Sequence, residues 1–204
     1  MIRWGILSTA KIGREQVIPA ILEAKGASLT AISSRDPEKA KALADHFGAP
    51  FSFGSYEELI SSKHIDAVYI PLPTSDHVNW SIKTAEMGKH VLCEKPIALK
   101  SSDIDKLIQT ESQSKVLISE AFMVTYHPQW IMVKKLLQND EIGPLKQVQG
   151  AFTYFNKDPS NMRNQLELGG GGLPDIGVYP IVTTRFVSNQ EPHSVTSRIK
   201  YDTP

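Results

Sequence analysis

Short apolar runs alternate with helical patterns through the first 120 residues of this 204-residue chain. The runs are continuous and rich in β-branched residues, which is typical of parallel strands covered on both faces. Five of them are predicted to be strands: Ile2–Leu7, Ser28–Ser33, Ala67–Pro71, His90–Glu94 and Val116–Glu120. Because strand–helix–strand crossovers are right-handed, the pattern predicts an α/β fold with a doubly wound parallel sheet.

The segments between these runs have helical spacing and clear helix starts. Asp36 is expected to cap a helix whose first residue is Pro37. Ser55 and Glu58 have the spacing of a capping box, for a short helix over Tyr56–Ser62. The remaining helices of this part are predicted at Lys11–Ala24, Asp76–Met87 and Ser102–Ser114.

The pattern changes after Ala121. Alternating, partly aromatic runs predict antiparallel strands at Leu145–Phe155 and His193–Tyr201. Around them we expect a helix at Pro128–Gln138, a polar loop at Asn156–Glu167, four glycines at Gly169–Gly172 and a helix from about Pro174. We therefore predict a first domain over residues 1–121 and an α+β domain over residues 122–204. Two strands make a poor sheet, so we expect the second domain to be incomplete and the chain to be part of a longer protein.

Composition excludes several classes of partner. Lys+Arg and Asp+Glu number 22 each, so no global positive charge favours nucleic acid or a membrane surface. The chain has no signal-peptide pattern and no apolar run long enough to span a bilayer. Cys93 is alone and lies in an apolar run, which predicts a buried thiol and a reducing compartment. We expect a cytoplasmic protein that binds a small molecule, without a metal site, because the histidines and Cys93 form no ligand cluster.

The first predicted strand enters its helix through "WGILSTAKIG", residues 4–13. A phosphate-binding turn needs small residues where backbone N–H groups approach a pyrophosphate at a helix N-terminus. Ser8 and Ala10 stand where such turns usually carry glycine, and the hydroxyls of Ser8 and Thr9 can bond phosphate oxygens. The alternative is a small-residue helix cap without a ligand. The position after the first strand of an α/β chain favours the dinucleotide site.

The end of the second strand bears on the choice between NAD and NADP. An NAD site places an acidic residue here to bind the ribose 2′-hydroxyl. This chain has Ser34 and Arg35 instead, a hydroxyl and a guanidinium suited to a 2′-phosphate. Asp36 comes one residue too late and serves better as a helix cap. NADP is therefore the expected cofactor, NAD remains possible, and the alternative reading makes Arg35 a solvated surface charge.

Two further segments carry reactive groups. Lys95 precedes Pro96, which holds it extended at the carboxyl edge of the sheet, where open α/β sheets bind ligands. Asp175 and Tyr179 are four residues apart in the predicted helix that follows the glycines, hence on one face. A phenol near a lysine cation has a lowered pKa and can exchange a proton with an alcohol. Each residue also has an ordinary reading, as a surface lysine, a helix-start aspartate or a core tyrosine.

Taken together, these motifs resemble the glucose–fructose oxidoreductase / inositol dehydrogenase / MocA family (Gfo/Idh/MocA). The chain looks most similar to the branch with dimeric dihydrodiol dehydrogenase and NADP-dependent D-xylose dehydrogenase. The motifs that carry the resemblance are "GILSTAKIG", "SSRDPEKA", "PLPTSDHV", "CEKP", "EAFM" with "HPQW", and "DPSNMRNQLELGGGGLPDIGVYP". Val124 and Thr125 depart from the Tyr-Arg pair that close relatives tend to show.

The resemblance implies a Rossmann domain followed by a domain with an open-faced antiparallel sheet, and a homodimer in the full-length protein. It places the catalytic groups on Lys95, Asp175 and Tyr179, with a cis Lys95–Pro96 bond. The implied cofactor contacts are Ser8, Thr9, Ala10, Lys11, Ile12, Ser34, Arg35, Pro71, Leu72, Pro73, Thr74, His77, Glu94 and Lys95. Asn161 and Arg163, in the loop before the glycines, are candidates for binding substrate, and the alternative for both is a solvated loop. For His77 the alternative is packing at the start of its helix.

The leading hypothesis is an NADP-dependent oxidoreductase that transfers a hydride between nicotinamide and a carbinol carbon of a sugar or trans-dihydrodiol. In it Tyr179 is the general base, Lys95 lowers the pKa of the phenol, and Asp175 orients the substrate. Two alternatives stay open: a dinucleotide-binding sensor without turnover, and a glycosidase that holds its NAD permanently.

Overall fold

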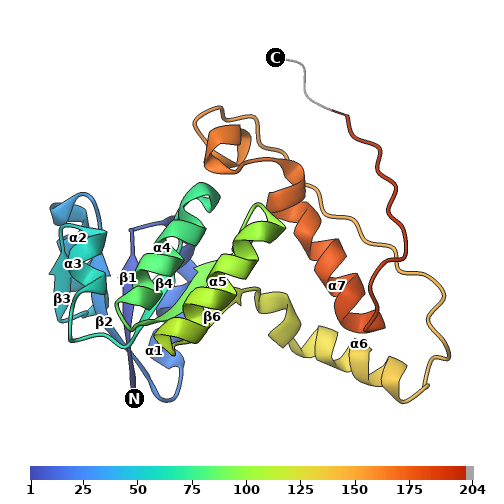
Figure 1. Cartoon of the computed structure of the whole chain (residues 1–204), viewed down its shortest axis with the longest axis horizontal. Coiled ribbons are helices and arrows are strands. Elements are labelled where there is room, and N and C mark those ends of the chain that lie inside the picture. The colour runs from blue at the N-terminus through green and yellow to red at the C-terminus, as the bar shows by residue number, and fades with distance from the viewer. Residues whose placement is uncertain (201–204) are drawn as a thin grey trace. The chain divides into compact units, whose positions relative to one another are not determined.

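Six parallel strands form one sheet in the order β3-β2-β1-β4-β5-β6 (Figure 1). The structure is a computed structural model and describes residues 1–200. Five strands confirm the prediction: β1 (Ile2–Leu7), β2 (Ala27–Ser33), β4 (Ala67–Ile70), β5 (His90–Glu94) and β6 (Ile118–Ala121). The sixth, β3 (Phe51–Phe53), was not predicted, because three residues are too few to show a periodic pattern. The strand order is that of a dinucleotide-binding sheet, so the predicted fold class is confirmed for this part.

Helices cover both faces of the sheet because successive strand residues point to opposite sides. Ile6 packs in one apolar cluster with residues of α1 (Ile18–Glu23) and α2 (Pro37–Phe47). Its neighbour Leu7 packs in a second cluster with α3 (Tyr56–Ile60) and α4 (Thr74–Glu86). The helix α5 (Ser101–Ser114) lies beside α4 (Figure 1). Cys93 is fully buried in the second cluster, and burial raises the pKa of its thiol, so the predicted buried thiol is confirmed.

The predicted helix caps are present. Asp36 Oδ1 accepts hydrogen bonds from the amides of Glu38 (3.1 Å) and Lys39 (3.3 Å). Ser55 Oγ accepts from the amide of Glu58 at 3.2 Å. The reciprocal bond differs from a regular capping box, since Glu58 Oε2 accepts from Gly54, one residue before the cap. These local bonds fix where α2 and α3 begin.

Two predicted helices contain a π-helical turn in place of regular α-helix. One turn covers Gly13–Val17 before α1, and the other covers Leu173–Gly177 before α7 (Val178–Ser188). A proline follows each turn closely, Pro19 in α1 and Pro180 in α7. Proline has no N–H to donate to the carbonyl four residues earlier, which accounts for the irregular hydrogen bonding at these places. The prediction that Asp175 and Tyr179 lie on one regular α-helix is therefore wrong: Asp175 is in the π-helical turn and Tyr179 is in α7.

The chain forms two compact units. The first comprises Met1–Phe122 and Phe155–Asp175, and the second comprises Met123–Tyr154 and the residues from Ile176 onward. The domain ranges 1–121 and 122–204 stay a prediction. In the second unit a short 3₁₀ helix (Met123–Tyr126) and α6 (Pro128–Gln138) precede α7, and α6 and α7 contact each other.

The two predicted strands of the second half are absent from the described part of the chain. Residues 145–155 and residues 193–200 form no strand, and Tyr201 lies outside the described residues. A strand needs a neighbour that accepts and donates its backbone hydrogen bonds. Within residues 1–200 neither segment pairs with another, so the alternating pattern produces no sheet. The same part of the chain holds no helix with the length and hydropathy required to cross a bilayer.

Candidate functional site

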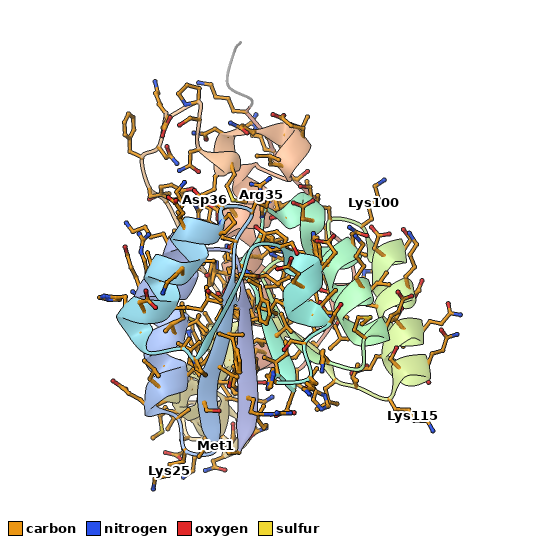
Figure 2. The ribbon with its side chains drawn as sticks, turned by 90° about the vertical axis from the view of Figure 1, so that its left-hand side faces the viewer. Met1, Lys25, Arg35, Asp36, Lys100 and Lys115 are labelled. Carbon is orange, nitrogen blue, oxygen red and sulfur yellow. The ribbon has the colours of Figure 1, made fainter. Side chains whose placement is uncertain are left out.

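The first unit brings several predicted site residues to the carboxyl edge of its parallel sheet. The strand order reverses between β1 and β4, so the Ser8 turn and the Pro71–Thr74 loop leave neighbouring strands there. In open α/β sheets this switch point is where ligands bind. Figure 2 shows Arg35 and Asp36 at the opposite end of the sheet from Met1 and Lys25. The ends of β2 and β5 add Arg35 and Lys95 to the same edge.

Ser8 adopts the backbone conformation that a glycine usually has in a phosphate-binding turn. Its φ angle is 72°, in the left-handed region that glycine usually occupies. Ser8 Oγ accepts a hydrogen bond from the amide of Ala10 at 3.2 Å, which supports this conformation. Helical residues begin at Lys11, so the first amides of the helix follow the turn directly. The turn therefore has the backbone shape and the small side chains that a pyrophosphate requires.

The residues after β2 fit an anionic group better than a ribose hydroxyl. Asp36 is committed to capping α2, and its bond from the Lys39 amide is the largest of the contacts that lower its pKa. Ser34 is buried, and its Oγ accepts from the amide of Asp36 at 3.1 Å. Arg35 is exposed, and its charge lowers the pKa of the nearby Tyr56 hydroxyl. Burial raises the pKa of Tyr56 more than Arg35 lowers it, so the phenol stays neutral beside the guanidinium.

The loop after β4 is closely packed. Pro71, Leu72 and Thr74 are buried, so their side chains mainly shape the loop. His77, in the first turn of α4, is 1% exposed, and both ring nitrogens lie 2.8 Å from backbone carbonyl oxygens, those of Leu72 and Pro96. Both ring nitrogens of His77 thus face backbone carbonyls, and its contact with a cofactor stays a prediction.

Lys95, Asp175 and Arg163 form the main charged group of the edge. Asp175 Oδ1 accepts hydrogen bonds from Lys95 Nζ at 3.2 Å and from Arg163 Nε at 3.1 Å. Lys95 Nζ also donates to the backbone carbonyl of Asp175. The side chains of Lys95 and Asp175 are 14% and 13% exposed, so this ion pair is weakly screened by water. The Lys95–Pro96 peptide is cis, as predicted.

Glu94 links the end of β5 to the interior of the sheet. Its Oε1 accepts from the hydroxyl of Tyr69 at 2.6 Å, and its Oε2 accepts from the amide of Lys95 at 3.3 Å. Tyr69 is fully buried in β4, and burial together with the Glu94 charge raises the pKa of its phenol. Both carboxylate oxygens of Glu94 are thus held in place beside the lysine.

The glycine-rich segment holds Asp175 and Arg163 through close backbone packing. Asn161 Oδ1 accepts from the amide of Arg163 at 3.0 Å and caps a 3₁₀ turn (Met162–Asn164). A Cβ atom at Gly170 would lie 2.6 Å from the carbonyl oxygens of Met162 and Arg163. Only glycine fits at this point without displacing the backbone. Asn161 therefore orders the loop, and the roles of Asn161 and Arg163 in binding substrate stay predictions.

Tyr179 belongs to the second unit. It lies in the first turn of α7, and its ring is 5.1 Å from the ring of Phe152, centroid to centroid. Its carbonyl accepts a hydrogen bond from Thr183 Oγ1 at 2.8 Å. The assignment of Tyr179 as a general base stays a prediction.

Family models match both halves of the chain. The model described as an oxidoreductase family with an NAD-binding Rossmann fold matches residues 2–122, the part that carries the phosphate turn and Lys95. The model of the GFO/IDH/MocA C-terminal domain matches residues 130–204. The chain belongs to the GFO/IDH/MocA family. The resemblance inferred from the motifs is confirmed, and with it the class of the cofactor, a nicotinamide dinucleotide.

Three relatives show the range of this similarity. The chain is 46% identical to an uncharacterized oxidoreductase, ORF334, of Rhizobium meliloti, with 96% of this chain and 58% of the relative covered. It is 37% identical to D-xylose 1-dehydrogenase (NADP(+)) 2 of Haloferax volcanii, with 89% and 56% covered. The crystal structure of KijD10, a 3-ketoreductase from Actinomadura kijaniata in complex with NADP and TDP-benzene, is 34% identical with a TM-score of 0.86, with 91% and 57% covered. The chain thus spans less than two thirds of the length of each relative.

Two residues of the site were missed by the reasoning from sequence. Tyr69 stands in an apolar run that predicts only a strand, although a buried phenol needs a hydrogen-bond partner. Glu120 lies in the "EAFM" motif but was given no role, and its carboxylate accepts from the amide of Ile97 at 2.9 Å. A polar group at the end of a buried parallel strand is the signal that both residues share.

Proposed function

We propose that the protein containing this chain is an NADP-dependent oxidoreductase that acts on a carbinol carbon of a sugar or vicinal diol. The observation that supports this most directly is the Lys95–Asp175 ion pair at the carboxyl edge of the sheet, in the unit that carries the phosphate turn. When bound, the nicotinamide accepts or supplies the hydride. Relatives named as a sugar dehydrogenase and as a ketoreductase carry out the two directions of this chemistry.

The residues of the first unit suit the parts of the dinucleotide. The Ser8 turn and the first helical amides would hold the pyrophosphate. Ser34 and Arg35 would bind a 2′-phosphate, since Asp36 is committed to its helix cap. This arrangement favours NADP over NAD.

The remaining groups would move and hold the proton of the reacting alcohol. Lys95 stabilises the oxyanion that forms on the substrate, and Asp175 fixes the direction of the lysine side chain. Tyr179 is proposed as the general base, and Asn161 and Arg163 as groups near the substrate. A homodimer is proposed for the whole protein.

Steady-state kinetics on the full-length protein test this function. NADP⁺ reduction is followed with D-xylose and with a trans-dihydrodiol, and NAD⁺ is compared at equal concentration. Lys95→Ala should lower kcat by about 100-fold or more, the usual cost of losing a donor that stabilises a developing oxyanion. Lys25→Ala, an exposed lysine at the opposite end of the sheet, is the matched control and should retain full activity.

Other results point to the alternatives. Full activity of Lys95→Ala contradicts the mechanism. Tight NADP binding without turnover on any polyol or ketose favours a sensor. Hydrolysis of a glycoside with retained NAD favours a glycosidase.

A further inference from the structure

The backbone around Lys95 is contacted by side chains from two other elements. The Pro96–Ile97 peptide, one residue after the lysine, has a side-chain group within hydrogen-bond distance of each of its polar atoms. His77 of α4 lies 2.8 Å from the Pro96 carbonyl oxygen, through Nδ1. Glu120 of β6 accepts from the Ile97 amide at 2.9 Å, through Oε1. Rotation of this peptide breaks the amide's bond to Glu120, and also the bond at the carbonyl when Nδ1 carries the proton.

His77 also connects this peptide to the Pro71–Thr74 loop, which is expected to contact the cofactor. Its Nε2 lies 2.8 Å from the carbonyl oxygen of Leu72, in the loop that follows β4. A neutral imidazole donates from one nitrogen and a doubly protonated ring donates from both. In either state the buried ring fills the space between the two loops, so a shift of one loop is passed to the other.

We propose that His77 and Glu120 are positioning residues that fix Lys95 through the Pro96–Ile97 peptide. The inference rests on the proposed function, because it assumes that Lys95 acts on the substrate. Neither residue needs to touch substrate or cofactor. An error of about 1 Å in the placement of a catalytic group can cost on the order of 100-fold in rate, so the backbone that carries Lys95 must be rigid.

The surroundings of Glu120 allow a clean substitution. It lines a groove of about 190 Å³ with apolar residues of α5 and the loop before it, among them Ile97, Ile104 and Leu107. Leucine in place of Glu120 would suit this lining and would remove the acceptor. Glutamine keeps a carbonyl oxygen and restores it. Glu111 lines the same groove and accepts from the Ile118 amide at 3.0 Å, so Glu111→Leu removes an equivalent bond away from the lysine loop.

Hydrogen exchange tests the bond between the Ile97 amide and Glu120 without any catalytic readout. In the full chain, Glu120→Leu should raise the exchange rate of the Ile97 amide by about tenfold or more, because a bonded amide exchanges only when its bond opens. Glu120→Gln and Glu111→Leu should leave that rate close to the wild-type value. Unchanged exchange at Ile97 in Glu120→Leu overturns the inference, whether or not the protein has the proposed activity.

Kinetics then test the link to Lys95. Glu120→Leu should lower kcat by about tenfold with an unchanged KM for NADP, and Glu120→Gln should restore kcat. His77→Phe should lower kcat and also raise the KM for NADP, since it disturbs the Leu72 loop as well. In a Lys95→Ala background, Glu120→Leu should cause no further loss. If Glu120→Leu lowers kcat in the Lys95→Ala background as much as in the wild type, Glu120 does not act through the lysine and the inference is overturned. Failure of the proposed function would give a different result, a Lys95→Ala protein that is fully active.

Discussion

The two compact units bury their apolar side chains to very different degrees. In the first, strand and helix residues such as Ile6, Ile18 and Val68 are 0% exposed, and two clusters fill the two faces of the sheet. In the second, helix residues such as Ile131 and Ile181 are about half exposed, at 51% and 50%. A group that must be held within a fraction of an ångström needs a packed surrounding. Lys95, Asp175 and Arg163 all belong to the first unit.

Truncating a core side chain gives the largest expected contrast between the units. Ile18→Ala in α1 should cost about 2–5 kcal/mol of the free energy of unfolding, because it removes a fully buried side chain and leaves a cavity. Ile131→Ala in α6 makes the same change at a half-exposed helical position and should cost less than about 1 kcal/mol. Urea denaturation of both variants measures the difference. Equal costs would show that the second unit is packed as firmly as the first.

The glycine-rich segment offers an intermediate effect. It belongs to the first unit although it lies late in the sequence. Gly170→Ala should destabilise the protein by about 1–3 kcal/mol, because a Cβ atom there would meet carbonyl oxygens at 2.6 Å. Gly172→Ala is the control, since a Cβ atom at that position has nothing within 4 Å. Thermal unfolding compares the two, and a Gly170→Ala protein as stable as Gly172→Ala would mean that the segment packs less closely than described.

The smallest effect is expected from exposed ion pairs, and one pair from each unit serves for the comparison. In the first, Arg3 binds Asp66 and lowers the pKa of that carboxyl to about 2, from an ordinary value of 3.8. The stabilisation is therefore present above about pH 4 and is lost as the pH falls through 2. Asp66→Asn should remove this pH dependence at a cost of less than about 1 kcal/mol at neutral pH, since both side chains are over a third exposed.

The matching pair of the second unit is Arg185 with Glu191, at 2.5 Å. Glu191→Gln should also cost less than about 1 kcal/mol, because both groups are exposed. Acid titration of unfolding at two salt concentrations checks both pairs. A loss of several kcal/mol for either substitution would show that the pair is more deeply buried in solution.

The strands predicted in the first half of the chain are confirmed, and the two predicted in the second half are absent from the described residues. The difference follows from how much of each pattern depends on burial alone. A buried parallel strand shows itself as a continuous apolar run, and a helix cap shows itself within four residues, so β1, β2 and the Asp36 cap could be predicted. An alternating run indicates only a strand that is half buried. Whether it pairs depends on a neighbour elsewhere in the chain, and residues 145–155 have none within the described part.

The same distinction applies within the site. Lys95 could be predicted because the proline after it and the strand before it are adjacent in sequence. Two bonds could not be predicted, because the path of the chain decides them. One joins Lys95 to Asp175, 80 residues away, and the other joins Ile97 to Glu120.

The sequence alone determined the parallel sheet, the phosphate turn and the presence of a lysine at the carboxyl edge, because each depends on a pattern within a few neighbouring residues. Only the tertiary structure decided that Ser8 adopts the glycine conformation, that Asp175 joins two cations, and that Tyr69, His77 and Glu120 surround the lysine loop. These contacts join residues from separate elements, and they form only when the sheet has brought the ends of its strands together.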